Sequence, residues 1–126
     1  MKSSGQLLTG NLLIGAQQVV GSKGTLYAIN PTTGEQLEPA YHLGSADDVE
    51  RACQLAEQAF DCYRATLPAA RANFLETIAR NIETLGDVLI KRAMAETGLP
   101  KARLEGERGR TCNQLRLFAA TIQAGE

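Results

Sequence analysis

The sequence predicts a chain in which a strand-rich segment, residues 1–45, precedes a helical part, residues 46–126. The first segment is rich in Gly, Thr, Gln and β-forming residues and carries only four charged side chains. The second segment is charged and rich in Ala, Leu and Arg, and its apolar residues recur at helical spacing. We therefore expect β-hairpins or a meander, followed by three to four amphipathic helices.

Short apolar runs and turn-forming residues place the strands. We expect strands at residues 11–15, 17–20 and 25–30, a turn at 21–24, and an extended piece at 35–43. The strand at 25–30 and the extended piece at 35–43 are joined by Asn-Pro-Thr-Thr-Gly at residues 30–34. Pro31 fixes φ, Gly34 tolerates a positive φ, and Asn30 bonds readily to nearby backbone groups. This stretch predicts a tight turn between two extended pieces.

The first helix has a clear start and a regular apolar face. Ser45 and Asp48 match a capping box, and acidic residues are favoured at the positive end of a helix. Apolar residues then follow at spacings of four, three, four and three. They are Val49, Cys53, Ala56, Phe60 and Tyr63. This periodicity predicts a stripe that faces the core.

Proline and glycine mark the boundaries of the later helices. Pro68 suits the first turn of a second helix, and Gly86 is expected to bend or break that helix. Gly98, with Pro100 just beyond it, predicts a helix end. A last helix is expected from about Lys101 to Ala124.

Composition excludes several classes of partner. The net charge is −1, from 13 basic and 14 acidic residues, which argues against nucleic acid and anionic membranes. No apolar run approaches the ~20 residues of a membrane span. The apolar stretch near the start is interrupted at residues 9–11, unlike a signal peptide. We expect a cytoplasmic protein with no membrane partner.

The residues that usually carry chemistry are sparse. Cys53, Cys62 and Cys112 show no paired spacing, and His42 is the single histidine, so no metal site is expected. Reduced, mostly buried thiols are the simplest interpretation. His42 has no nearby Ser or Cys that would make a nucleophile–base pair. We predict no catalytic residue in this chain.

No nucleotide-binding motif is present either. The stretch GSKGT, residues 21–25, lacks the spacing of a phosphate-binding loop and precedes a strand instead of a helix. Gly106 and Gly109 lie inside a helical pattern and do not form a GxGxxG motif. We expect no cofactor to be bound by this chain.

The order of the segments resembles the N-terminal portion of the aldehyde dehydrogenase superfamily. The matching stretches are NLLIGAQQV, YAINPTTGEQL, SADDVERACQLAEQAF and ARANFLETIARNIETLGDVLIKRAMAETGLPKARLEGE. The resemblance implies an α/β fold and makes the turn at 30–34 an early strand connection. The last helix, RTCNQLRLFAATIQAGE, looks most like the branch that oxidises α-ketoglutaric semialdehyde (2,5-dioxopentanoate), close to NADP-dependent fatty aldehyde dehydrogenases.

Complete members of that family are several times longer than this chain. They contain a Rossmann core, a catalytic domain with a nucleophilic cysteine and a general-base glutamate, and an oligomerisation segment, none of which is recognisable here. The resemblance therefore implies an N-terminal fragment, with 46–126 as the helical part of the cofactor-domain region. It would be inactive alone. The complete enzyme would be a homo-oligomer that uses NADP or NAD to oxidise an aldehyde to a carboxylate.

The resemblance also suggests a substrate-binding face on the last helix. At 100° per residue, Asn113, Gln114 and Leu117 lie within about 60° of Arg110. In the family, the matching face lines the entrance to the aldehyde tunnel. Arg110 would then bind a distal carboxylate of the substrate, with Asn113 and Gln114 adding hydrogen bonds. From the residues alone, a solvated helix surface is the simpler interpretation of this face.

A second hypothesis remains open at this point. Without the resemblance, helices that follow a hairpin also suit a stand-alone binding or scaffold module with no catalytic activity. Such a module would bury its apolar stripes within itself or against a partner.

Overall fold

The computed structural model describes residues 8–125, so the first part of the predicted segment 1–45 lies outside it. Two antiparallel hairpins come first. Their strands are β1 (Leu12–Ile14), β2 (Gln17–Val19), β3 (Thr25–Ile29) and β4 (Gln36–His42). Four helices follow. They are α1 (Ala46–Arg64), α2 (Pro68–Thr84), α3 (Gly86–Thr97) and α4 (Lys101–Ala124). The predicted order of strands and helices is confirmed.

The turn between β3 and β4 forms as its sequence predicts. The Asn30 side-chain oxygen accepts a hydrogen bond from the Thr32 N–H at 2.9 Å, and the Gly34 N–H donates to the Asn30 carbonyl at 2.8 Å. The turn also lies against the end of α3, where a Cβ on Gly98 would be 3.2 Å from Pro31 Cγ. This contact connects the β3–β4 hairpin to the helical part.

Local signals set the helix ends. The Ser45 hydroxyl accepts from the Asp48 N–H at 3.2 Å, and Asp48 accepts from the Ser45 N–H at 2.8 Å, so the capping box is present. The Asp48 carboxylate also accepts from the Ser45 hydroxyl at 2.8 Å. The bond from the Ser45 N–H, followed by the bond from the hydroxyl, lowers the pKa of Asp48. Gly86 has φ +55°, which no ordinary helix residue adopts, and it separates α2 from α3. Gly98 ends α3 in the left-handed conformation.

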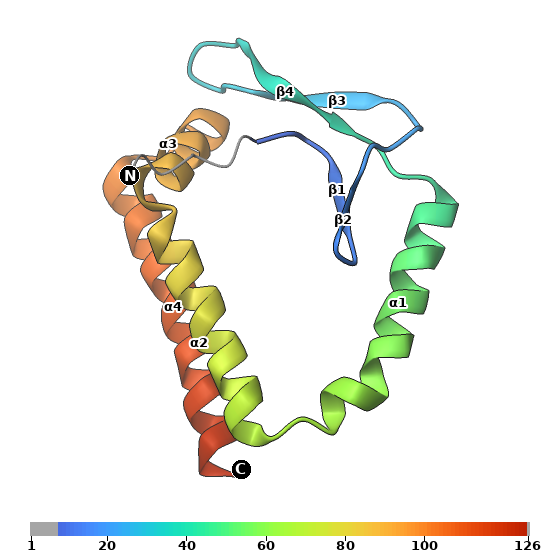
Figure 1. Cartoon of the computed structure of the whole chain (residues 1–126). Helices are drawn as coiled ribbons and strands as arrows, with labels where there is room; N and C mark the ends of the chain where they lie inside the picture. The colour runs from blue at the N-terminus through green and yellow to red at the C-terminus, as the bar shows by residue number, and fades with distance from the viewer. Residues whose placement is uncertain (1–7, 126) are drawn as a thin grey trace, which may run out of the picture.

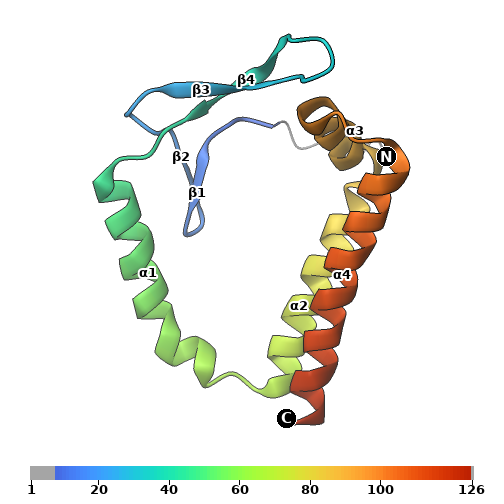
Figure 2. The same cartoon turned by 180° about the vertical axis from the view of Figure 1, so that it is seen from behind.

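The best-packed part of the described chain is the antiparallel pair of α2 and α4, which lie side by side in both views (Figures 1 and 2). The pair is close because small side chains meet at its interface. They are Ala72, Ala79, Cys112 and Ala119, all buried. Ile90 of α3 and Leu104 of α4 extend this core toward α3.

Helix α1 stands apart from that pair (Figures 1 and 2). Its predicted burial is wrong for the described residues. No residue of α1 is buried, and Val49 and Phe60 are 63% and 61% exposed. Its main contact is with β1, and Tyr63 packs edge-to-face on Phe74 of α2 at 6.3 Å. The stripe is present, but nothing in the described chain covers it.

The cysteines follow the same division. Cys112 is buried between α2 and α4, whereas Cys53 and Cys62 are exposed on α1. The expectation of mostly buried thiols is therefore correct only for Cys112. The two exposed thiols belong to the helix that buries none of its described residues. Among the described residues, no helix is both long and apolar enough to cross a membrane.

Candidate functional site on helix α4

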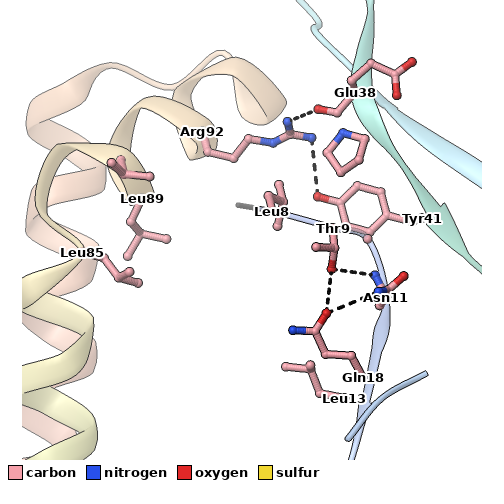
Figure 3. A pocket seen from close by; sticks show the side chains of 13 residues that line it. Leu8, Thr9, Asn11, Leu13, Gln18, Glu38, Tyr41, Leu85, Leu89 and Arg92 are labelled. Atoms are coloured by element: carbon pink, nitrogen blue, oxygen red, sulfur yellow. Dashed lines mark hydrogen bonds between the residues drawn. The ribbon is translucent and has the colours of Figure 1, made fainter. Parts of the chain in front are cut away.

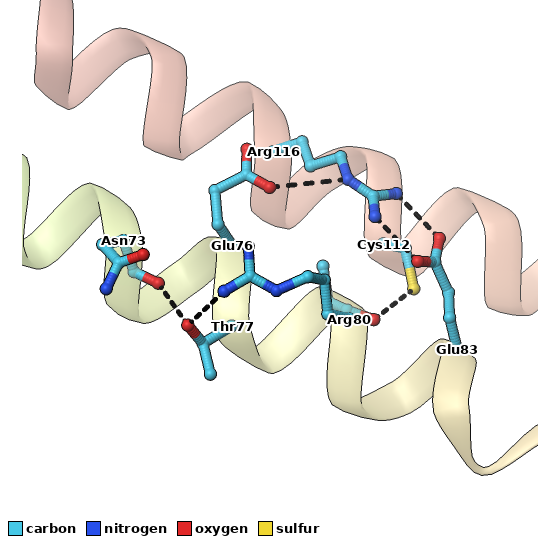
Figure 4. A network of polar contacts seen from close by, with 8 residues as sticks. Asn73, Glu76, Thr77, Arg80, Glu83, Cys112 and Arg116 are labelled. Carbon is cyan, nitrogen blue, oxygen red and sulfur yellow. Dashed lines mark hydrogen bonds and ion pairs between the residues drawn. The ribbon is translucent and has the colours of Figure 1, made fainter.

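The rotation of α4 about its axis is fixed by contacts with α2 (Figure 4). The Cys112 thiol donates to the Ala79 carbonyl at 3.6 Å, inside the interface. At its edge, the Arg116 guanidinium makes two hydrogen bonds of 2.8 Å with the Glu83 carboxylate and lies 3.6 Å from Glu76. The Arg116 hydrogen bonds lower the pKa of Glu83, and Glu83 raises the pKa of Arg116. These contacts decide which face of α4 points outward.

The four predicted residues lie together on that outward face. Arg110, Asn113 and Gln114 are exposed, and Leu117 is 57% exposed. On the opposite side, Cys112 and Ala119 are buried where α4 contacts α2. The structure thus brings the predicted set together on one surface, and what this surface binds remains a prediction.

Arg110 differs from the other basic side chains of α4. Within the described residues, Lys101 pairs with Asp87, Arg108 donates to a backbone carbonyl, and Arg116 binds Glu83. Arg103 pairs with Glu107 at 2.9 Å. Among residues 8–125, no hydrogen bond or ion pair is found for Arg110. A guanidinium in this state can bind a carboxylate through two parallel hydrogen bonds.

A second feature is a groove of about 860 Å³ between the β1–β2 hairpin, β4 and the start of α3 (Figure 3). Its wall combines apolar side chains with a few polar ones. The apolar ones are Leu8, Leu13, Pro39, Leu85, Val88 and Leu89. The polar ones bond to one another, as when Thr9 and Asn11 both donate to the Gln18 side-chain oxygen at 3.3 Å.

Arg92 joins two elements at this groove (Figure 3). Its guanidinium donates to the Glu38 carbonyl and to the Tyr41 hydroxyl on β4, and it pairs with Glu96 on α3 at 2.7 Å. Hydrogen bonding to Glu96, ahead of smaller contributions from Tyr41, raises the pKa of Arg92. Because its partners are all supplied by the protein, Arg92 holds β4 against α3 and is not a free ligand-binding group.

The glycines that superficially resemble nucleotide-binding motifs have other places in the structure of residues 8–125. Gly21 lies where a Cβ would be 2.3 Å from the Leu43 carbonyl oxygen, so its lack of a side chain serves packing within the chain. Gly106 and Gly109 lie inside α4, as predicted, and not at the start of a helix that follows a strand.

The groups that serve most often as nucleophile, base or metal ligand are scattered. His42 lies on β4, Cys53 and Cys62 on α1, and Cys112 within the α2–α4 interface. No group of three or more His, Cys, Asp or Glu side chains in residues 8–125 is arranged to hold a metal ion.

Sequence reasoning missed the Arg92 cluster and the Arg103–Glu107 pair. Both contain a pair spaced by four residues on a helix, Arg92–Glu96 and Arg103–Glu107, which is a visible signal. The link from Arg92 to Tyr41 spans 51 positions and has no local signature.

Comparison with a solved structure shows the fold. An NAD-dependent benzaldehyde dehydrogenase from Corynebacterium glutamicum matches 98% of this chain and 27% of its own, with a TM-score of 0.86 and 22% identity. The two hairpins and four helices therefore have the arrangement found in an aldehyde dehydrogenase.

Two relatives agree with that result. An α-ketoglutaric semialdehyde dehydrogenase 2 from Azospirillum brasilense is 60% identical over 119 residues, 94% of this chain and 23% of that protein. An α-ketoglutaric semialdehyde dehydrogenase from Acinetobacter baylyi is 41% identical over 117 residues, 93% of this chain and 22% of that protein. A family model for aldehyde dehydrogenases matches residues 19–126. The chain belongs to the aldehyde dehydrogenase family, and it spans less than a quarter of the length of these two relatives.

Proposed function

We propose that this chain is the N-terminal portion of an NAD(P)-dependent aldehyde dehydrogenase that oxidises a semialdehyde with a distal carboxylate to the dicarboxylate. The preferred substrate is α-ketoglutaric semialdehyde. The observation that carries this proposal is 60% identity to the Azospirillum brasilense protein of that name over nearly the whole chain. The complete enzyme is a cytoplasmic homo-oligomer.

Within this function, the chain contributes scaffold and one wall of the substrate entrance. The α2–α4 pair is the best-packed part, and it presents Arg110 on its outer face. Arg110 binds the carboxylate of the substrate, and Asn113 and Gln114 add hydrogen bonds to it. These contacts orient the substrate and take no part in the chemical step.

The remaining exposed surfaces support a part of a larger protein over a stand-alone module. The described residues bury mainly small side chains, while Val49, Phe60, Phe74 and Phe118 are all exposed. A stable independent module normally buries its large apolar residues. We expect the chain alone to show no aldehyde-dependent formation of NADH or NADPH.

The test is the Arg110→Ala substitution in the complete enzyme. We expect kcat/KM for α-ketoglutaric semialdehyde to fall by a factor that corresponds to about 1–3 kcal/mol, the size of a lost charged hydrogen bond. An uncharged aldehyde of the same length, pentanal, should be oxidised nearly as well as by the unmodified enzyme, because it makes no contact with the guanidinium.

Arg51→Ala provides a matched control, since Arg51 is an exposed arginine on α1 with no place in the proposed site. It should leave both substrates unaffected. If Arg110→Ala lowers kcat/KM equally for both aldehydes, Arg110 is a solvated surface residue and does not bind the substrate carboxylate. Turnover by the chain alone that disappears when a cysteine is replaced would overturn the proposal as a whole.

A further inference from the structure

An ion pair lies beside Arg110 on the same face of α4. Arg103 Nε is 2.9 Å from Glu107 Oε1, and the two side chains are 64% and 48% exposed. At 100° per residue, both lie within about 60° of the direction of Arg110. The α4 surface therefore presents two cations and one anion side by side, and the anion is paired with Arg103.

Glu107 is spaced so that it could pair with either of two arginines. It lies four residues after Arg103 and three residues before Arg110, and both spacings bring helical side chains within reach of each other. A pair with Arg110 would occupy the guanidinium that the proposed function assigns to the substrate. A carboxylate substrate would then have to displace Glu107 before it could bind.

We propose that Arg103 is a positioning residue that holds Glu107 away from Arg110 and so keeps the Arg110 guanidinium open to the substrate carboxylate. This inference rests on the proposed function of Arg110. It assigns a second arginine to the selection of acidic aldehydes, acting through Glu107 and making no contact with the substrate.

The inference predicts a selective kinetic effect. In the complete enzyme, Arg103→Gln should lower kcat/KM for α-ketoglutaric semialdehyde about two- to five-fold, because an exposed ion pair shifts an equilibrium by no more than that. The loss should appear in KM and leave kcat unchanged, since the chemical step is untouched. Oxidation of pentanal should not change.

A simpler explanation must be separated from this one. Removing Arg103 also removes a positive charge that attracts an anionic substrate from a distance. The Glu107→Gln background separates the two effects. If Arg103 acts through Glu107, Arg103→Gln has no effect when Glu107 is already Gln. If Arg103 attracts the substrate directly, the loss persists in that background and the inference is overturned.

A structural readout is independent of any substrate. In a crystal structure of the Arg103→Gln variant, we expect the Glu107 carboxylate within about 4 Å of the Arg110 guanidinium, which is ion-pair distance. A Glu107 side chain that stays free would contradict the inference. Arg103→Lys, which retains a cation four residues from Glu107, should restore the original pair.

This design distinguishes two failures. If Arg110→Ala impairs acidic and uncharged aldehydes equally, the proposed function of Arg110 fails, while the crystal structure still reports whether Arg103 holds Glu107. If Arg110→Ala is selective but Arg103→Gln is silent and Glu107 does not move, the proposed function stands and this inference falls.

Discussion

Helices α1 and α4 differ in how their apolar residues are buried. Helix α1 has the more regular apolar stripe of the two, and both helices begin where their sequences predict. The stripe of α4 is buried against α2 through Cys112 and Ala119, whereas the stripe of α1 is exposed along its length. Periodicity therefore shows which face of a helix requires a partner, and it does not show where that partner lies.

The two helices also differ in how they are held. Helix α4 is fixed by tertiary contacts, which include the Cys112 thiol and the Arg116–Glu83 ion pair. Helix α1 relies mostly on local features, above all its Ser45–Asp48 capping box. Isolated helices of this kind are marginal in water, because most helix stability in proteins comes from packing.

The largest expected effect comes from enlarging a buried alanine. Ala79→Leu adds three carbon atoms to a site with no exposed surface and should lower the free energy of unfolding by about 1–3 kcal/mol through overpacking. The matched substitution Ala56→Leu, on the exposed stripe of α1, should change it by less than about 0.5 kcal/mol. Urea unfolding of the 126-residue chain measures both.

Equal destabilisation by the two substitutions would contradict the comparison, because it would mean that α1 is as tightly packed as α4. The same pair sharpens the comparison in the complete enzyme. There, a costly Ala56→Leu would indicate that further protein covers the α1 stripe.

A smaller effect is expected from the helix cap. Ser45→Ala removes the hydroxyl that accepts from the Asp48 N–H and should destabilise α1 by about 1 kcal/mol. Because α1 has little tertiary support, fraying at its first turn should leave α2 and α4 unchanged. Amide hydrogen exchange resolved by segment would show this. Ser22→Ala, in the loop between the hairpins, is the control and should have no effect on α1.

The smallest effect is a pH dependence confined to the α2–α4 pair. Arg116 lowers the pKa of Glu83 in the folded chain below its usual 4.5. A lowered pKa means that this pair adds stability above pH 4.5 and loses it as the pH falls through the folded-state value. Acid unfolding of the chain should show this loss, and Arg116→Gln should reduce it. An unchanged acid transition in Arg116→Gln would show that the Arg116–Glu83 pair does not contribute to the pH dependence of stability.

Much of the fold was predictable because its signals are local. The turn at residues 30–34, the start of α1 at Ser45 and the bounds of α4 all follow from a few neighbouring residues. The break at Gly86 was visible for the same reason. The burial of α1 was not predictable, because it depends on which elements face it in space.

The candidate site shows the same limit. Helical spacing placed Arg110, Asn113, Gln114 and Leu117 on one face, and the structure places that face away from α2. Spacing did not reveal that Arg103 binds Glu107 while Arg110 has no partner in residues 8–125. A charged side chain on a helix has several possible partners at suitable spacings, and only the three-dimensional structure shows which of them it binds.

The central claim is that α2 and α4 complete each other within this chain, whereas α1 is completed by protein outside it. Amide hydrogen exchange of the 126-residue chain, measured alone and in the complete enzyme, tests this directly. We predict that in the chain alone α2 and α4 exchange slowest and α1 exchanges rapidly, and that α1 becomes strongly protected in the complete enzyme. Protection of α1 equal to that of α2 and α4 in the chain alone would contradict the claim.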